Sequence, residues 1–330
     1  MQKNEFPKVS IMIPTFNQEK FIAKAIESAL MQDYPNLEII VSDDCSTDST
    51  PRVVKGYLAD NRLRYYKNEK NLGRIGNYRK TLYERVTGEW TLNLDGDDYL
   101  YENSVISCMA SRLLAYKNEN IVAVMGPQLT TYSSSGMSIK SPTNYTAGLF
   151  EGTDILLDWN RLHFGHLAIL YNVDLSRKID YYRLNTISSD WESILRLIIH
   201  GKVAVVDAII GVWNIHDSNI SSSGSITDEI EDYSYIEETY SYALERGLNK
   251  QKLYIWHREM VRSHTRHVWR SNIHAHGKIG IFIPYVFRNY PFAITEILRP
   301  KSIAVNMLKM YPALFRKVKI LYQQYKHKRV

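Results

Sequence analysis

Short apolar runs alternate with stretches of helical periodicity through the first hundred residues. Four runs have the length and composition of buried strands: 9–13, 37–42, 63–68 and 89–94. Three intervening stretches place apolar side chains three or four positions apart and predict helices: 18–32, 50–60 and 74–87. Asn17 is expected to cap the first helix and Gly88 to end the third. This alternation predicts βαβ units and a mainly parallel sheet.

The pattern is more mixed beyond the first hundred residues. Two strands and one helix are predicted there: 120–126, 202–213 and 190–201. Residues 130–148 form a long polar stretch, typical of a loop that covers a site, and 216–225 has the composition of a boundary or lid. Residues 226–275 are helical in pattern.

Polar clusters follow three of the predicted strands. They read "PTFN" at 14–17, "DDCSTD" at 43–48 and "DGDD" at 95–98. In an open parallel sheet, ligands bind at the carboxyl ends of the strands, so these clusters are expected to converge on one ligand.

The third cluster places Asp95, Asp97 and Asp98 within four positions. Carboxylates at that spacing repel one another, and a cation bound among them would offset that repulsion. Mg²⁺ and Mn²⁺ prefer oxygen ligands and commonly bind one or two carboxylates together with substrate phosphates. A calcium loop counted from Asp95 would need glycine at Leu100 and glutamate at Ile106, so that alternative fails. A polar turn remains open as an alternative because Asp-Gly is a common turn pair, although a turn does not require the third aspartate.

Glycine-rich phosphate loops are missing from the sequence. Gly73 and Gly76 lie in "NLGRIGNYRK" but match neither the dinucleotide fingerprint nor the P-loop. A Rossmann dehydrogenase and a P-loop nucleotidase are therefore disfavoured. If phosphates bind here, a metal and Arg74 are expected to neutralise them. The alternative role of Arg74 is that of a surface cation.

The composition favours a packed globular protein. The chain has 330 residues, of which 45% are hydrophobic and 23% charged, enough for one large domain and a smaller one. Cys45 and Cys108 are the two cysteines, which fits a reducing compartment rather than a disulfide scaffold. No apolar run has the length of a signal peptide or a membrane span, so a cytoplasmic location is expected.

Basic residues concentrate near the C-terminal end. Residues 297–330 hold nine Lys or Arg and no acid, which leaves 32 basic against 35 acidic residues elsewhere in a chain of net charge +6. Such a tail after Tyr285, Phe287, Tyr290 and Phe292 is expected to contact the inner face of the cytoplasmic membrane. The alternatives are a solubilising helical tail, aromatic packing on the rest of the protein, or a homodimer interface. Nucleic-acid binding is disfavoured because no recognition motif accompanies the charge.

The sequence resembles glycosyltransferase family 2. Residues 9–50 carry the family's opening strand–helix–strand pattern and its D-D-x-S-x-D cluster. Residues 71–77 resemble the N-x-G motif, and 92–100 the D-x-D metal motif. Residues 188–216 resemble the segment that carries the catalytic E-D pair and a terminal Y-R-x-H.

This resemblance covers about residues 7–222 and implies a GT-A fold. That fold is a Rossmann-like α/β architecture with a mainly parallel sheet flanked by helices. The expected division is a catalytic domain at 1–222 and a mostly helical C-terminal region at 223–330, which has the basic, aromatic tail.

Three positions depart from the family pattern. The E-D pair is here Ser189-Asp190, so only the aspartate is retained. The tyrosine of P-x-Y-N is Phe16. The Y-R-x-H is Trp213-Asn214-Ile215-His216, so the arginine is lost and the histidine kept. The Q-x-x-R-W motif and membrane spans of the processive synthases are missing, which favours single-sugar transfer over polymerisation.

The resemblance also implies roles for individual residues. Asp190 would be the general base, and its alternative role is to cap the helix that follows. Asp97 would bind a divalent metal, Mn²⁺ or Mg²⁺, with Asp98 and Asp95 as further candidates. His216 would reach the diphosphate or the metal, or else be an exposed loop histidine.

The remaining matched positions are expected to hold the nucleotide sugar. Pro14, Thr15 and Phe16 would line the base, while Asp43 or Asp44 would accept a hydrogen bond from a uracil imide or, alternatively, cap the next helix. Asp95 would touch ribose or metal-bound water. The full set of donor-binding residues expected from the matched motifs is Pro14, Thr15, Phe16, Asn17, Asp43, Asp44, Asn71, Gly73, Arg74, Asp95, Gly96 and His216.

The implied reaction is metal-assisted sugar transfer with inversion. The donor is expected to be a nucleotide-diphosphate sugar, with UDP favoured, and the acceptor a glycan or lipid-linked glycan in surface polysaccharide synthesis. One alternative is a non-catalytic nucleotide-sugar or carbohydrate-binding protein on the same fold, which the changes at Ser189 and 213–216 favour. A nucleotidyltransferase is disfavoured because "IPTFNQEKF" lacks a glycine-rich, basic signature.

Overall fold

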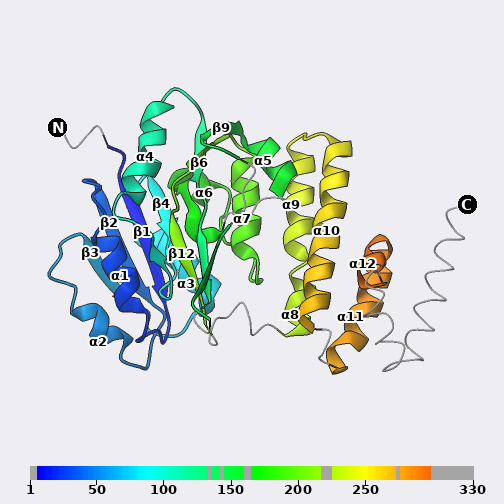
Figure 1. The fold of residues 1–330 in the computed structure, drawn as a ribbon, viewed down its shortest axis with the longest axis horizontal. Coiled ribbons are helices and arrows are strands. Elements are labelled where there is room, and N and C mark those ends of the chain that lie inside the picture. Colours follow the sequence, from blue (N-terminus) through cyan, green and yellow to red (C-terminus); the bar gives the residue numbers. More distant parts are fainter. Residues whose placement is uncertain are drawn as a thin grey trace, which may run out of the picture.

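Figure 1 shows the computed structural model of the chain. The structure describes these residues: 6–132, 135–141, 145–159, 165–216, 225–272 and 276–298. Within these ranges, no helix combines the length and the apolar content needed to cross a membrane. Most of the predicted lid, and the basic tail from residue 299 onward, lie outside the described residues. The predicted membrane contact of that tail therefore stays a prediction.

A mixed eight-stranded sheet forms the centre of the molecule. Its order is β3-β2-β1-β4-β10-β6-β11-β9. The strands are β1 (Val9–Thr15), β2 (Leu37–Asp43), β3 (Leu63–Lys67), β4 (Trp90–Asn93), β6 (Ile121–Met125), β9 (Gly148–Glu151), β10 (Ile169–Asn172) and β11 (Lys202–Val205). The first four strands run parallel, as the sequence pattern predicts, and β10 is antiparallel to both of its neighbours. The fold is thus α/β, with four adjacent parallel strands from the N-terminal half and a further parallel pair between β6 and β11.

The helices of the N-terminal half follow the predicted order with shifted boundaries. They are α1 (Ile22–Leu30), α2 (Thr50–Lys55), α3 (Gly73–Lys80), which continues as a π-helix (Thr81–Arg85), and α4 (Val105–Ala115). The predicted cap at Asn17 is wrong, because α1 begins at Ile22 and the Asn17 Oδ1 atom accepts from the Thr47 N–H at 2.8 Å. Gly88 lies beyond the helix end, where a Cβ atom would be 2.5 Å from Ser10 Oγ. Close approach to β1, rather than helix termination, requires that glycine.

A second, four-stranded sheet overturns two predictions. Its order is β5-β12-β7-β8, from β5 (Tyr99–Leu100), β12 (Gly211–Ile215), β7 (Leu129–Tyr132) and β8 (Met137–Lys140). The strand predicted at 202–213 is two strands, β11 and β12, in different sheets. The stretch predicted as a loop at 130–148 contains the antiparallel β7–β8 pair. The first error arises because β11 and β12 pair with partners that are distant in sequence, and the second because the residues of β7 and β8 are mostly polar and lack an apolar strand pattern.

The C-terminal half supplies the remaining helices. The helices beside the main sheet are α5 (Gly152–Asp158), α6 (Val173–Lys178) and α7 (Ser189–Ile198), with a 3₁₀ turn at His166–Ala168. The helical region comprises α8 (Ile226–Glu231), α9 (Ser234–Glu245), α10 (Lys250–Asn272), α11 (His276–Asn289), a 3₁₀ turn (Pro291–Ala293) and α12 (Ile294–Leu298). In Figure 1, α9 and α10 stand beside α7 and α5, with α11 and α12 farther out.

The helical region and the sheet share one hydrophobic core. Ile194 and Leu197 of α7 belong to the same buried cluster as Ile236 and Val261 from the helical region. The helical character predicted for 226–275 is confirmed over α8, α9 and α10. The proposed division at residue 222 remains a sequence-based one, since the core is continuous across it.

The aromatic residues before the tail pack inside the helical region. Tyr290 stacks on Tyr233 with ring centroids 4.8 Å apart. The guanidinium of Arg258 lies 4.1 Å from the centroid of the Phe292 ring. Tyr285 and Phe287 pack against the same core cluster. These contacts favour the packing interpretation for the four aromatics over exposure to a membrane.

Candidate active site

A cleft of about 930 Å³ opens at the carboxyl ends of β1 and β4. The chain proceeds from β1 to β2 on one side, while β4 pairs with β1 on the other, so the cleft lies where the strand order reverses. Ligands of open α/β sheets bind at such a point. The cleft is lined by most of the predicted site residues: Pro14, Thr15, Phe16, Asn17, Asp44, Asn71, Gly73, Arg74, Asp95, Asp97, Asp98, Asp190 and His216.

Asp43 and Gly96 do not line the cleft but shape its wall. Asp43 is fully buried, and its carboxylate accepts from the Ser46 N–H at 2.8 Å and from the Tyr65 hydroxyl at 2.6 Å. At Gly96, a Cβ atom would be 2.9 Å from Thr15 Oγ1 and 3.1 Å from Thr15 Cβ, in addition to 2.4 Å from the movable Gln18 Oε1 atom. Only glycine therefore lets the loop after β4 pack this closely on the loop after β1.

Asp44 is the member of the aspartate pair that faces the cleft. Its Oδ1 atom accepts from Asn68 Nδ2 and from the Leu72 N–H, each at 2.9 Å. The next turn is held by Asn71, whose Oδ1 accepts from the Gly73 N–H at 2.9 Å. Gly73 has a φ of 77°, a left-handed conformation that favours glycine. The N-x-G motif thus builds a turn that fixes one edge of the cleft.

The three aspartates after β4 have different surroundings. Asp95 Oδ1 accepts from the Tyr78 hydroxyl at 2.6 Å and from Asn93 Nδ2 at 2.8 Å. Asp98 is 5% exposed, and its Oδ1 accepts from the Asn214 N–H at 2.9 Å. Asp97 Oδ2 lies 3.1 Å from His216 Nε2. The sequence alone did not distinguish these roles.

Burial and mutual repulsion act on two of these carboxylates. Burial, together with the charge of Asp95, raises the pKa of Asp97, which His216 partly offsets. Burial also raises the pKa of Asp98 well above its ordinary value, with added repulsion from Asp97 and Asp95. Both effects disfavour the charged forms. A cation at this cluster would stabilise those charged forms.

The donor set is compatible with a divalent ion held together with a phosphate ligand. In the part of the chain that the structure describes, no three His, Cys, Asp or Glu side chains are grouped to hold a metal by themselves. Mg²⁺ usually takes only one or two carboxylates and completes its shell with water and substrate phosphates. Asp97 is the carboxylate best suited to this, with the His216 ring next to it and stacked on Phe21 at a centroid distance of 4.2 Å.

Asp190 lies across the cleft from this cluster, in the first turn of α7. It is 8% exposed, and its Oδ2 atom is 3.8 Å from His166 Nδ1. The other ring nitrogen of His166 is 2.7 Å from the Tyr182 hydroxyl. Asp190 does not cap α7, because the cap position is Ser188. The carboxylate is therefore available at the cleft wall with an imidazole beside it.

Arg74 supports the segment before Asp190 from the opposite side. Its Nη2 atom donates to the carbonyl oxygens of Thr186 and Ile187, at 2.9 and 2.6 Å. Its charge also interacts with the carboxylates of Asp190 and Asp95. The alternative of a surface cation is wrong, because α3 presents Arg74 to the cleft.

Among the residues close to the site's carboxylates, His166, Tyr78 and Asn93 were not identified from the sequence. The sequence around His166 has no periodic pattern, so nothing pointed to it. Tyr78 is on the buried face of α3 and had the appearance of a core residue. Asn93 had a usable signal: it is a polar residue inside the apolar run of β4, and its Nδ2 atom donates to Asp95.

Comparison with known proteins gives a family match over the N-terminal half. The model of the family described as "Glycosyl transferase family 2" matches residues 10–179, just over half of the chain. A poly(ribitol-phosphate) beta-N-acetylglucosaminyltransferase, TarS, from Staphylococcus aureus is 30% identical over 166 residues. This match covers 45% of the chain and 29% of TarS.

A second relative comes from Campylobacter jejuni. The GalNAc(5)-diNAcBac-PP-undecaprenol beta-1,3-glucosyltransferase of that organism is 38% identical over 122 residues, covering 36% of the chain and 38% of the relative. The chain thus spans about a third of the length of the curated relatives that it matches.

Solved structures share the fold over almost the whole chain. The crystal structure of S. aureus TarS 1–349 in complex with UDP-GlcNAc has a TM-score of 0.69 at 18% identity, covering 97% of the chain and 92% of that structure. A mannosyltransferase from Pyrobaculum calidifontis in complex with GDP-Man and Mn²⁺ has a TM-score of 0.55 at 14% identity, covering 96% and 86%. Because both identities are low, these matches establish the fold alone.

Proposed function

The chain belongs to glycosyl transferase family 2, and from this membership we propose that it moves a single sugar, with inversion, from a nucleotide-diphosphate donor to a hydroxyl of a glycan acceptor. The observation that carries the proposal is the pairing, in one cleft, of the acidic cluster after β4 with the separate carboxylate of Asp190. The names of the relatives support a glycan or lipid-linked glycan as acceptor and surface polysaccharide synthesis as the pathway.

A UDP-sugar is the favoured donor. Phe16 is 45% exposed at the cleft, which leaves an aromatic face open to a nucleobase. The Asp44 carboxylate lies in the same part of the cleft and can accept from a uracil imide. The TarS structures with UDP-GlcNAc and with UDP support this choice of carrier.

The substitution at Ser189 does not argue for a non-catalytic protein. Ser189 is fully buried and does not line the cleft, whereas its neighbours Ser188, Asp190 and Trp191 do. A change at a position that faces the protein interior leaves the cleft's chemical groups in place. His216, the part of the altered 213–216 stretch that the family pattern retains, lines the cleft beside Asp97.

The proposed mechanism is a direct displacement. An acceptor hydroxyl oxygen bonds to the anomeric carbon while the bond from that carbon to the diphosphate oxygen breaks. Asp190 takes the hydroxyl proton as general base. The His166 ring lies beside that carboxylate, with its Nδ1 atom 3.8 Å from Asp190 Oδ2. Asp97 would hold a Mn²⁺ or Mg²⁺ ion, which when bound would supply Lewis-acid stabilisation of the charge on the departing diphosphate.

Donor binding tests the proposed function directly. We expect UDP-sugars with Mn²⁺ to raise the melting temperature, because a ligand at 100 times its Kd stabilises the folded state by about 2.7 kcal/mol.

Phe16→Ala should weaken UDP binding by about 1–3 kcal/mol through lost stacking, measured by calorimetry. Leu58→Ala, at a similarly exposed position outside the cleft, is the matched control and should bind as wild type does. Absence of both a thermal shift and transfer across UDP, GDP and dTDP sugars would refute the proposal.

The Mn²⁺ requirement for transfer should differ between variants of the adjacent residues Asp97 and Asp98. We expect excess chelator to abolish transfer, and Asp97→Asn to need far more Mn²⁺ for half-maximal activity. Asp98→Asn should keep a metal requirement near wild type. Its side chain already accepts from the Asn214 N–H, and an amide oxygen can replace that acceptor.

Manganese titrations of activity and of UDP affinity distinguish the outcomes. Equal loss of metal affinity in both variants would show that Asp98 is a ligand as well. Undiminished transfer in excess chelator would remove the metal from the mechanism altogether.

A further inference from the structure

The helical region contacts the segment that carries Asp190. Asp232, at the corner between α8 and α9, is 2% exposed. Its two carboxylate oxygens accept from the Ser188 N–H and from the Ser188 hydroxyl, both at 2.7 Å. Ser188 is the residue before α7, two positions from Asp190. A carboxylate from another part of the chain thus caps the helix that presents the base.

This contact ties down the N-cap residue of α7, Ser188, through both its N–H and its hydroxyl. The Ser188 side chain makes no capping bond to the first turn of α7, because its hydroxyl is directed to Asp232. The first N–H groups of a helix need acceptors, and a negative charge at that end is favourable. Asp232, 44 positions away in sequence, accepts from one of these groups, the Ser188 N–H, and places a carboxylate at that end of the helix.

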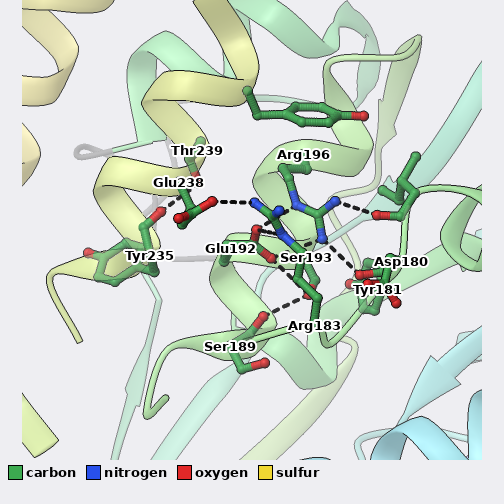
Figure 2. A network of polar contacts seen from close by, with 12 residues as sticks. Asp180, Tyr181, Arg183, Ser189, Glu192, Ser193, Arg196, Tyr235, Glu238 and Thr239 are labelled. Carbon is green, nitrogen blue, oxygen red and sulfur yellow. Dashed lines mark hydrogen bonds and ion pairs between the residues drawn. The ribbon is translucent and has the colours of Figure 1, made fainter. Parts of the chain in front are cut away.

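A second contact holds the same turn from its other side. Figure 2 shows Arg183 between Glu192 of α7 and Glu238 of α9, with ion pairs of 2.8 Å to each. Glu192 also pairs with Arg196 at 2.6 Å. Asp190 therefore lies midway between two anchored residues, Ser188 and Glu192, and both anchors lead to the helical region.

The corner that carries Asp232 is itself held in place by packing within the helical region. The next residue, Tyr233, is buried and stacks on Tyr290. Its hydroxyl is 2.7 Å from Thr265 Oγ1 on α10. The position of Asp232 is thus determined by packing among α9, α10 and α11, and through Ser188 that packing reaches the cleft.

We propose that Asp232 is a positioning residue for the general base, and that the helical region acts in catalysis by fixing the first turn of α7. This inference rests on the proposed function, because it takes Asp190 as the base. Misplacement of a catalytic group by about 1 Å can cost about 10²-fold in rate. The donor site is built mainly from the loops after β1, β2 and β4, so donor affinity should not depend on Asp232.

Three substitutions and one control test this role. Asp232→Ala is expected to lower kcat by about 10²-fold, with the donor Kd near wild type. Asp232→Asn should recover most of that turnover, because its amide can accept from the Ser188 N–H and donate to the Ser188 hydroxyl. Ser188→Ala, which loses one of the two bonds, should fall between them.

The control is Ile297→Ala, which removes a buried side chain of α12 and leaves a cavity. Helix α12 packs on α10 and α11. Ile297→Ala should lower the melting temperature of the protein while kcat stays near wild type. If Ile297→Ala and Asp232→Ala lose kcat in proportion to lost stability, Asp232 is only structural and the inference fails. It also fails if Asp232→Ala keeps full turnover, or if Asp232→Asn recovers none. Wild-type protein without transfer activity would instead refute the proposed function itself.

Discussion

Replacing Asp190 with asparagine is expected to lower kcat by about 10²–10⁴-fold while donor binding stays near wild type. The amide keeps the size of the side chain but cannot take the acceptor's proton. The donor residues lie on other elements, so calorimetric titration with UDP should give a nearly unchanged Kd. Single-turnover transfer from a UDP-sugar measures the loss in the chemical step.

A matched control for this variant is Asp154→Asn. Asp154 is in the first turn of α5, as Asp190 is in the first turn of α7, but it is exposed and lies outside the cleft. It should keep wild-type turnover. Turnover near wild type in Asp190→Asn would exclude Asp190 as the base, and a lost UDP affinity would show that it holds the donor instead.

Replacing Glu192 with alanine is expected to lower the free energy of unfolding by about 3–5 kcal/mol. Glu192 is fully buried and pairs with Arg196 and Arg183 (Figure 2). Arg196 is 1% exposed, and its Nη2 atom also donates to the Asp180 carbonyl at 2.9 Å. In the absence of Glu192, the positive charge of Arg196 would remain buried and would lose the carboxylate that compensates it. Urea denaturation monitored by fluorescence measures the change.

Glu238→Ala provides the control at the exposed end of the same network. The Glu238 side chain is 46% exposed, so its ion pair with Arg183 should contribute only about 0–1 kcal/mol. The double variant Glu192→Met/Arg196→Leu should recover much of the loss, because it removes both buried charges. A loss below about 1 kcal/mol in Glu192→Ala would mean that water reaches Arg196 and that the network is not a buried one.

The N-terminal half of the fold could be predicted from local pattern. The runs at β1, β2, β3 and β4 are short and apolar, and the parallel arrangement follows from the helices between them. The prediction that polar clusters converge also follows from local information, because the carboxyl ends of neighbouring parallel strands lie at one edge. Thr15, Asp44 and Asp97 indeed line one cleft.

Predictions failed where the structure depends on pairing between distant segments. The run at 202–213 has uniform apolar character, yet β11 pairs with β6 and β12 pairs with β7. The polar stretch at 130–148 gave no strand signal, because β7 and β8 belong to a small sheet with exposed residues. Local composition carries no record of the distant partners of β11 and β12, whereas β7 and β8 are close in sequence and were missed because their stretch is polar.

The sequence by itself determined the elements of the parallel sheet, the acidic cluster after β4 and the presence of Asp190 beyond it, since each depends on residues close together in the chain. Only the tertiary structure decided that Asp44 rather than Asp43 faces the cleft, that His166 lies beside Asp190, and that Asp232 holds Ser188. These contacts join segments far apart in sequence. Their geometry follows from how the sheet and the helical region pack into one core, which no local periodicity encodes.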